Sequence, residues 1–142
     1  MSGNDAASLA EIRILDGVSA EDLADMEKAC SWRRYTDHEQ IIDRQSDSTD
    51  VYFVVDGRVR IVNYSLAGKE ITLEDLDHGS HFGELSALDG QPRSASVMSL
   101  ESSLIAALPQ DRFIKLLQSN PEIAFRVLRA LAGIIRNSTD RI

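Results

Sequence analysis

The order of hydrophobic and polar positions divides the chain into three regions. Residues 7–31 carry apolar side chains at helical spacing, and Ser19-Ala-Glu-Asp22 reads as a capping box at the start of a helix. Residues 32–108 consist of short runs rich in β-branched residues, with turn residues between them. Helical spacing returns in residues 111–142. The pattern predicts a mainly β fold that is flanked by helices in the sequence.

The central region contains a clear turn signal. Asp56-Gly57 separates Val51–Val55 from Arg58–Val62, and Asp-Gly between two β-branched runs predicts a two-residue hairpin. Many short strands with turns at regular intervals are typical of a sandwich or a barrel. The other predicted strands are Gln40–Asp43, Glu70–Leu76, Arg93–Ser99 and Ser103–Leu108.

Two helices are predicted in the C-terminal region. The first covers Asp111–Gln118, while Asn120 and Pro121 are typical of the cap and the first turn of a second, longer helix. A narrow stripe at alternating steps of four and three residues follows and suits a seam between two helices, with packing on the helix's own domain as the alternative. Because the stripe continues to the end of the chain, we expect a longer natural protein cut at this point, with a native end as the alternative. The stripe consists of Ala124, Leu128, Leu131, Ile135, Ser138 and Ile142.

Composition and charge narrow the class of protein. A chain of 142 residues, 43% of them hydrophobic, suffices for one domain whose core needs no disulfide or metal. The net charge of −8 argues against a nucleic-acid-binding face, because phosphate backbones are bound by clustered Lys and Arg. The start of the chain does not resemble a signal peptide, and no apolar run approaches membrane-spanning length. We therefore expect a cytoplasmic protein that contacts neither nucleic acid nor membrane.

The single cysteine, Cys30, limits covalent and metal chemistry. One thiol excludes an intrachain disulfide, an all-cysteine zinc site and an iron–sulfur cluster held by this chain. Its position in a helical pattern predicts a buried small hydrophobe.

The stretch Phe82–Val97 carries the most specific chemistry. Gly83 allows a close backbone approach to a ligand, and a short helix that starts at Gly83-Glu84 would direct unpaired N–H groups at an anion. Arg93 supplies a planar cation that suits phosphate oxygens. The Glu84 carboxylate repels phosphate but accepts hydrogen bonds from sugar hydroxyls. The combination indicates a nucleotide as the ligand.

Phe82-Gly-Glu-Leu85 followed by Pro92-Arg-Ser-Ala-Ser-Val97 resembles the phosphate-binding cassette of the cyclic nucleotide-binding domain family, in the form found in catabolite-activator-protein-like sensor domains. This resemblance covers nearly the whole chain and implies one domain over residues 1–142, with the cassette at 82–97. The implied fold is a β-roll, a jelly-roll-like double-stranded barrel, with N-terminal helices and a long C-terminal helix. The other stretches that resemble the family are Val51–Val62, Gly68–Ile71 and Gln118–Ile123.

The resemblance also implies roles for individual residues. Arg93 would pair with the cyclic phosphate, Ser94 would add a hydroxyl or backbone donor, and Glu84 would accept from the ribose 2′-hydroxyl. Gly83 and Leu85 would contribute backbone contacts.

Near the C-terminus, the resemblance places Ser138 and Thr139 where related proteins present hydroxyls to the adenine. Solvated polar residues at a helix end are the alternative. Arg93-Ser94-Ala95 resembles cyclic AMP sites, so cyclic AMP is expected in preference to cyclic GMP, and no metal is expected. The implied function is a regulatory sensor that repositions its C-terminal helix, forms a homodimer through that helix and acts on an effector that the sequence does not identify.

One turn departs from the family pattern. Where the family commonly has Gly-Asp, the turn Arg44–Asp47 is expected to place Ser46 in the position of the glycine, which is unfavourable at positive φ. We expect this turn to lie away from the cassette and not to abolish binding.

Two other functions compete with nucleotide sensing. His78, His81 and Glu84 suggest a cupin-like metal enzyme, but histidines three residues apart on a strand tend to face opposite sides. Gly79 implies a turn between them, which weakens this objection but supplies no further ligand. A degenerate dimerisation module without ligand is the second alternative, and the presence of Glu84 and Arg93 argues against it. Since no nucleophile–base pair is evident, we do not expect an enzyme.

Overall fold

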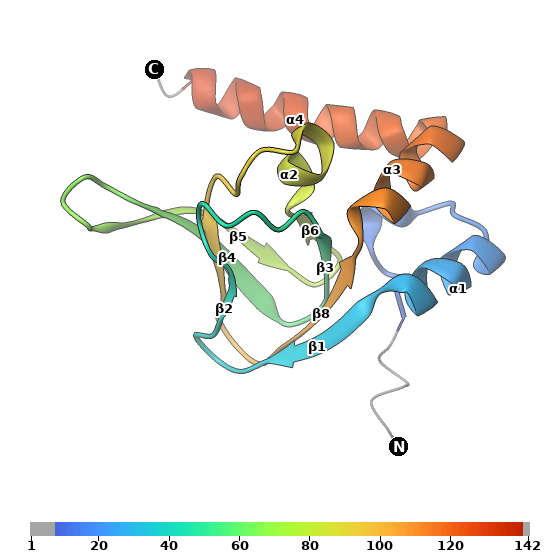
Figure 1. Cartoon of the computed structure of the whole chain (residues 1–142), viewed down its shortest axis with the longest axis horizontal. Helices are drawn as coiled ribbons and strands as arrows, with labels where there is room; N and C mark the ends of the chain where they lie inside the picture. The colour runs from blue at the N-terminus through green and yellow to red at the C-terminus, as the bar shows by residue number, and fades with distance from the viewer. Residues whose placement is uncertain (1–7, 141–142) are drawn as a thin grey trace.

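The computed structural model describes residues 8–140, with side chains described as far as Asn137. Eight strands form a β-roll, and the helices lie over one end and one side of it, with α4 across the top in Figure 1. The strands are β1 (Ser31–Tyr35), β2 (Gln40–Ile42), β3 (Val51–Asp56), β4 (Arg58–Tyr64), β5 (Glu70–Asp77), β6 (His81–Phe82), β7 (Ser96–Ser99) and β8 (Ser103–Leu108). The helices are η2 (Arg13–Leu15), α1 (Ala20–Ala29), α2 (Glu84–Asp89), α3 (Gln110–Ser119) and α4 (Pro121–Asp140).

The strands form two antiparallel sheets that face each other. The first has the order β1-β8-β3-β6 and the second the order β2-β7-β4-β5. Apolar side chains from both sheets, including Val54, Val59 and Phe82, form a core between them. A second core, which includes Phe113, Ile123 and Val127, lies between the first sheet and the helices. The mainly β fold with flanking helices is confirmed.

The hairpin predicted at Asp56-Gly57 is wrong. β3 and β4 belong to different sheets, so Asp56-Gly57 is a corner at which the chain passes from one sheet to the other. Gly57 has φ of 96°, and a Cβ at this position would lie 2.7 Å from the Ser102 carbonyl oxygen. The hairpin that does form joins β4 to β5, with Arg58 opposite Asp77 and Tyr64 opposite Glu70. Local turn chemistry identified the bend correctly but not the partner of each strand.

The turn at residues 44–47 also differs from the prediction. The positive φ of 75° is at Gln45 and not at Ser46. The turn contacts the cassette directly: the Gln45 N–H donates to the Arg93 carbonyl at 2.9 Å, and the Arg93 N–H donates to the Ser46 carbonyl at 2.9 Å. The expectation that this turn lies away from the cassette is therefore wrong.

The predicted cap at Ser19 is present, whereas the side chain of Asn120 has a different partner from the one predicted. The Ser19 hydroxyl accepts from the Asp22 N–H at 3.1 Å and caps α1, as predicted. The Asn120 side chain instead donates to the Leu116 carbonyl at 3.0 Å, so it satisfies the end of α3. Cys30 is half-buried beside the helical core, and burial raises the pKa of its thiol to about 12.

The predicted stripe along α4 is partly packed on the chain's own core and partly exposed. Ile123 and Val127 attach the helix to the core, and Leu131 packs against that core. Leu128 is 59% exposed, so part of the stripe is not covered by the described part of the chain. No helix in the described part of the chain is both long enough and apolar enough to span a membrane.

Candidate functional site

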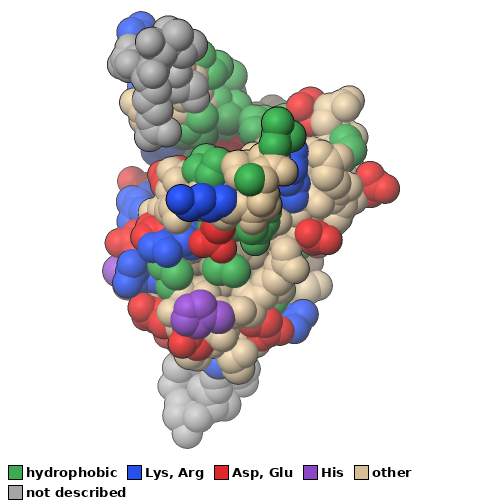
Figure 2. Space-filling model, turned by 90° about the vertical axis from the view of Figure 1, so that its left-hand side faces the viewer, with side chains coloured by type: hydrophobic (Ala, Val, Ile, Leu, Met, Phe, Trp, Pro, Cys, Tyr) green, Lys and Arg blue, Asp and Glu red, His purple; other side chains and the backbone are tan. Residues whose placement is uncertain are grey.

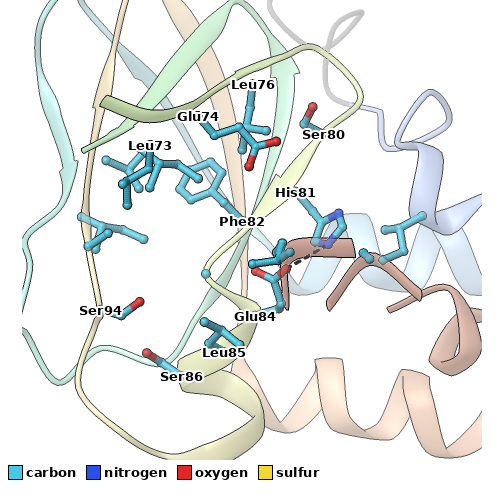
Figure 3. Close-up of a pocket in the computed structure, with 18 of the residues that line it drawn as sticks. Leu73, Glu74, Leu76, Ser80, His81, Phe82, Glu84, Leu85, Ser86 and Ser94 are labelled. Carbon is cyan, nitrogen blue, oxygen red and sulfur yellow. Dashed lines mark ion pairs between the residues drawn. The ribbon is translucent and has the colours of Figure 1, made fainter. Parts of the chain in front are cut away.

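A cavity of about 850 Å³ lies between the second sheet, the segment β6–α2 and the inner side of α4. Figure 3 shows its lining, with Phe82 and Leu76 at one side and Ser86 and Ser94 at the other. All five cassette residues that the sequence singled out line this cavity: Gly83, Glu84, Leu85, Arg93 and Ser94. The two parts of the cassette, Gly83–Leu85 and Arg93–Ser94, thus border the same cavity.

Arg93 is a buried cation whose near partners are neutral. It is only 3% exposed, and it donates to the Gly83 carbonyl at 2.8 Å, the Asp50 carbonyl at 2.7 Å and the Ser48 hydroxyl at 3.0 Å. Its guanidinium carbon lies 5.7 Å from the centre of the Tyr52 ring. Burial lowers the pKa of Arg93 from its ordinary value. Since none of the ion pairs between described side chains involves Arg93, its charge is available to attract an anion.

Gly83 makes the position of Arg93 possible. It has φ of 85° and precedes α2, and a Cβ there would lie 2.9 Å from Arg93 Nη1 and 3.1 Å from the Asp50 carbonyl oxygen. A side chain at this position would therefore displace the guanidinium or strain the backbone. The predicted helix after Gly83 is present as α2, and its Leu85 is 45% exposed beside the cavity.

Glu84 is a largely buried carboxylate at the other side of the cassette. Its Oε2 lies 3.3 Å from Nε2 of His81, and the two side chains are 12% and 16% exposed. Burial raises the pKa of Glu84, but the interactions with His81, the backbone N–H of Glu84 and the charge of Arg93 together outweigh that effect, so the pKa lies below its ordinary value. The carboxylate therefore stays an acceptor well into the acidic range.

The metal site considered from the sequence does not assemble. Although His81 and Glu84 are neighbours, no three His, Cys, Asp or Glu side chains of residues 8–137 are arranged to hold a metal ion.

α4 closes the cavity with small and apolar residues, one amide and one guanidinium. The residues of α4 that line it are Arg126, Ala130, Gly133, Ile134 and Asn137. The side chains of Ser138 and Thr139 lie outside the described residues, although the helix backbone continues to Asp140. Asn137 was missed because the resemblance directed the inference of base contacts to the two hydroxyl residues that follow it.

β5 contributes residues that sequence reasoning also missed. Ile61 pairs with Glu74 and Val62 with Thr72, so Leu73 is an extra residue in β5. Such a bulge disturbs the alternation of side chains along a strand, and both Leu73 and Glu74 line the cavity, as Figure 3 shows. Ser86, which is buried, also lines the cavity and lies on the same side as Ser94 in this view. A period-two pattern cannot place a bulge, and Ser86 has no sequence feature that distinguishes it.

The fold and the site define a β-roll domain that binds a small ligand with an anionic group and hydroxyls. The family model described as the cyclic nucleotide-binding domain matches residues 32–120, and the chain belongs to this family. The match contains the whole cassette.

Individual relatives agree with this family. The cAMP-activated global transcriptional regulator CRP of Haemophilus influenzae is 31% identical over 114 residues, which cover 80% of this chain and 51% of that protein. The cyclic AMP receptor protein of Thermus thermophilus is 35% identical over 88 residues, 62% of this chain and 41% of that protein. The chain thus spans about half the length of the curated relatives it matches.

Solved structures show the same architecture. The catabolite activator protein of Thermus thermophilus superimposes with a TM-score of 0.80 and 28% identity, covering 90% of this chain and 60% of that one. The regulatory domain of Toxoplasma gondii PKA, crystallised with cAMP, gives a TM-score of 0.70 at 22% identity over 81% of this chain and 45% of that one, and shows a shared fold.

Proposed function

We propose that this chain is a sensor that binds a cyclic nucleotide in the cavity beneath α4, with cyclic AMP preferred over cyclic GMP. The observation that carries the proposal is Arg93, a buried cation with neutral partners that shares one cavity with the acceptor Glu84. A ligand with one negative charge and a sugar hydroxyl matches both groups. The names of the two curated relatives, both of which refer to cAMP, support the choice of ligand.

In the proposed pose the cyclic phosphate lies at Arg93 and Ser94, and the ribose 2′-hydroxyl donates to Glu84. The backbone at Gly83 and Leu85 completes the contacts. The base extends toward α4, where Asn137 lines the cavity and where Ser138 and Thr139 follow. An amide both donates and accepts hydrogen bonds, which suits the edge of a nucleobase.

The proposed output is a shift in the position of α4. Besides its apolar contacts, this helix is attached to the N-terminal segment through Arg126, which donates to the carbonyls of Asp16 and, at 3.3 Å, Ile14. A ligand shifts such an equilibrium only by the difference in its affinity for the two positions of the helix. Contacts between the base and α4 supply that difference. The signal would pass to a partner protein or to a further domain.

We also propose a homodimer through α4. Phe125 is 55% and Leu128 is 59% exposed, and both border a shallow apolar groove between α3 and α4. In Figure 2, which views α4 from its C-terminal end, hydrophobic side chains are visible behind the grey terminus. A second copy of the same helix is the partner that the repeating stripe fits.

The remaining expectations stay predictions. On the face shown in Figure 2 acidic and basic side chains are intermixed, and the net charge of −8 favours no direct contact with nucleic acid. As in the sequence analysis, we expect that the protein catalyses no reaction, requires no metal and is located in the cytoplasm.

Calorimetric titration with cyclic AMP and cyclic GMP, side by side, tests the proposed function. We expect one ligand per chain for both nucleotides and a lower Kd for cyclic AMP. Equal Kd values would contradict the base preference alone. If neither nucleotide binds at millimolar concentration, the chain is a degenerate dimerisation module, which was the alternative from the sequence.

A further inference from the structure

A histidine without a role in the proposed pose lies beside the carboxylate assigned to the ribose. His81 is in β6, opposite Phe53 of β3, and its ring extends toward Glu84 in Figure 3. Its Nε2 is buried 3.3 Å from Glu84 Oε2, and no group in the described part of the chain makes a hydrogen bond with this nitrogen. A buried ring nitrogen without a hydrogen bond costs free energy. The contact is therefore close enough to become a charge-assisted hydrogen bond after a small adjustment, but it is not yet one.

We infer that His81 is a positioning residue for Glu84 and that cyclic nucleotide binding is coupled to the uptake of a proton by His81. This inference rests on the proposed function. A ribose placed over Glu84 displaces water from a carboxylate that is already largely buried. A protonated His81 compensates that charge on Oε2, while the 2′-hydroxyl donates to the other oxygen. With a neutral His81, the ligand would cover a carboxylate whose charge is less well compensated.

The other charged groups around the cavity do not replace this pairing. Arg13 of η2 donates to the Ser80 hydroxyl at 2.8 Å, Arg93 is held by the Gly83 and Asp50 carbonyls, and Arg126 of α4 donates to carbonyls of the N-terminal segment. These three cations oppose protonation of His81, and Glu74 of β5 favours it. Among the described lining residues, β3 contributes no charge. Glu84 is the charged group within ion-pair distance of His81.

The coupling between proton uptake and cyclic AMP binding predicts the direction in which affinity changes with pH. Histidine is the side chain whose protonation ordinarily changes between about pH 5 and pH 8. If binding favours protonated His81, the additional affinity is present at the acidic end of this range and is lost as the pH rises. Glu84 remains ionised there, because its pKa lies below the ordinary value. Cyclic AMP keeps one negative charge throughout, so the ligand itself does not contribute.

Calorimetry with cyclic AMP at pH 6, 7 and 8 tests the inference on the unaltered protein. We expect the affinity to be about three- to tenfold higher at pH 6 than at pH 8. Titrations in two buffers with different ionisation enthalpies measure proton uptake directly and should show net uptake near pH 7. Tight binding with no proton uptake and a flat pH profile would overturn the inference and leave the proposed function intact.

Variants test whether His81 causes the pH dependence of binding. His81→Gln keeps an N–H donor near the position of Nε2 but does not titrate, so its pH profile should be flat. His78→Gln, at an exposed histidine three residues away, is the matched control and should retain the pH dependence of the wild type. Glu84→Gln should bind more weakly and also lose the pH dependence. An unchanged profile in His81→Gln would exclude this histidine, whereas absence of binding at every pH in the wild type would refute the proposed function itself.

Discussion

Arg93 connects the stability of the site with its chemistry. The guanidinium joins two backbone segments, because it donates to the carbonyls of Gly83 and Asp50. No carboxylate among the described side chains forms an ion pair with it, so its positive charge lies unpaired there beside the cavity. A buried charge that has hydrogen bonds but no counter-ion is costly in the free protein. A ligand phosphate would pair with the guanidinium and reduce that cost. The relief of this unfavourable free energy would therefore contribute to binding.

Replacement of this side chain should affect both binding and folding. For Arg93→Ala we expect binding of cyclic AMP to weaken by at least about 1.5–3 kcal/mol, the scale of a hydrogen bond to a charged group. The melting temperature should also fall, because two buried carbonyls lose their donor. Titration calorimetry and thermal unfolding measure the two effects.

Ser48→Ala is the matched control for Arg93→Ala. It removes the hydroxyl that accepts from Nε but leaves the charge and the two carbonyl contacts. We expect nearly unchanged affinity for this variant. If Arg93→Ala binds cyclic AMP as the wild type does, the proposed pose is wrong.

At the scale of elements, the turn at residues 44–47 holds the cassette in place through backbone hydrogen bonds. Backbone hydrogen bonds in both directions connect it to Arg93, although the two segments are far apart in the sequence. To make these bonds the chain adopts a left-handed conformation at Gln45, where φ is 75°. The left-handed region costs a non-glycine residue roughly 1–2 kcal/mol. The turn thus stores strain that the cassette contacts offset.

Gln45→Gly should therefore stabilise the protein. We expect a gain of about 0.5–1 kcal/mol in the free energy of unfolding, since glycine removes the left-handed penalty but loses more chain entropy on folding. Urea unfolding measures the gain.

Ser46→Gly, at the neighbouring position where φ is not positive, is the control and should bring no gain. Equal effects of the two substitutions would show that strain at Gln45 is not the cause.

At the scale of the whole molecule, α4 has two surfaces with different roles. One side packs on the core and closes the cavity, and another exposes Phe125 and Leu128. Because a single helix carries both, a ligand that moves α4 also changes the surface offered to a second copy. Sensing and dimerisation are thereby coupled in the proposed mechanism.

A charge on the exposed side of α4 should prevent self-association. We expect Leu128→Glu to be monomeric in sedimentation velocity at concentrations where the wild type is a dimer, since the carboxylate would be buried in an apolar seam. The monomer should keep its fold, because Leu128 is 59% exposed.

Leu66→Glu, at a fully exposed leucine in the β4–β5 loop, introduces the same charge outside α4 and should not change the oligomeric state. A wild type that is monomeric at high concentration would contradict the proposed dimer.

Sequence patterns predicted much of this protein because its local chemistry is distinctive. Apolar periodicity predicted the helical ends and the β centre, and the order Gly83, Glu84, Arg93 predicted the ligand class before any contact was known. These inferences succeed because periodicity reports which face of an element is buried, and because phosphate and sugar hydroxyls each require particular side chains.

Only the tertiary structure decided which strands pair and which residues meet. Asp56-Gly57 has the composition of a hairpin turn, yet the burial of Val54 and Val59 between two sheets makes it a corner. The presence of Glu74 and Asn137 at one cavity depends on a bulge in β5 and on the position of α4 over the second sheet. These features arise from packing between distant segments, which residue spacing along the chain does not encode.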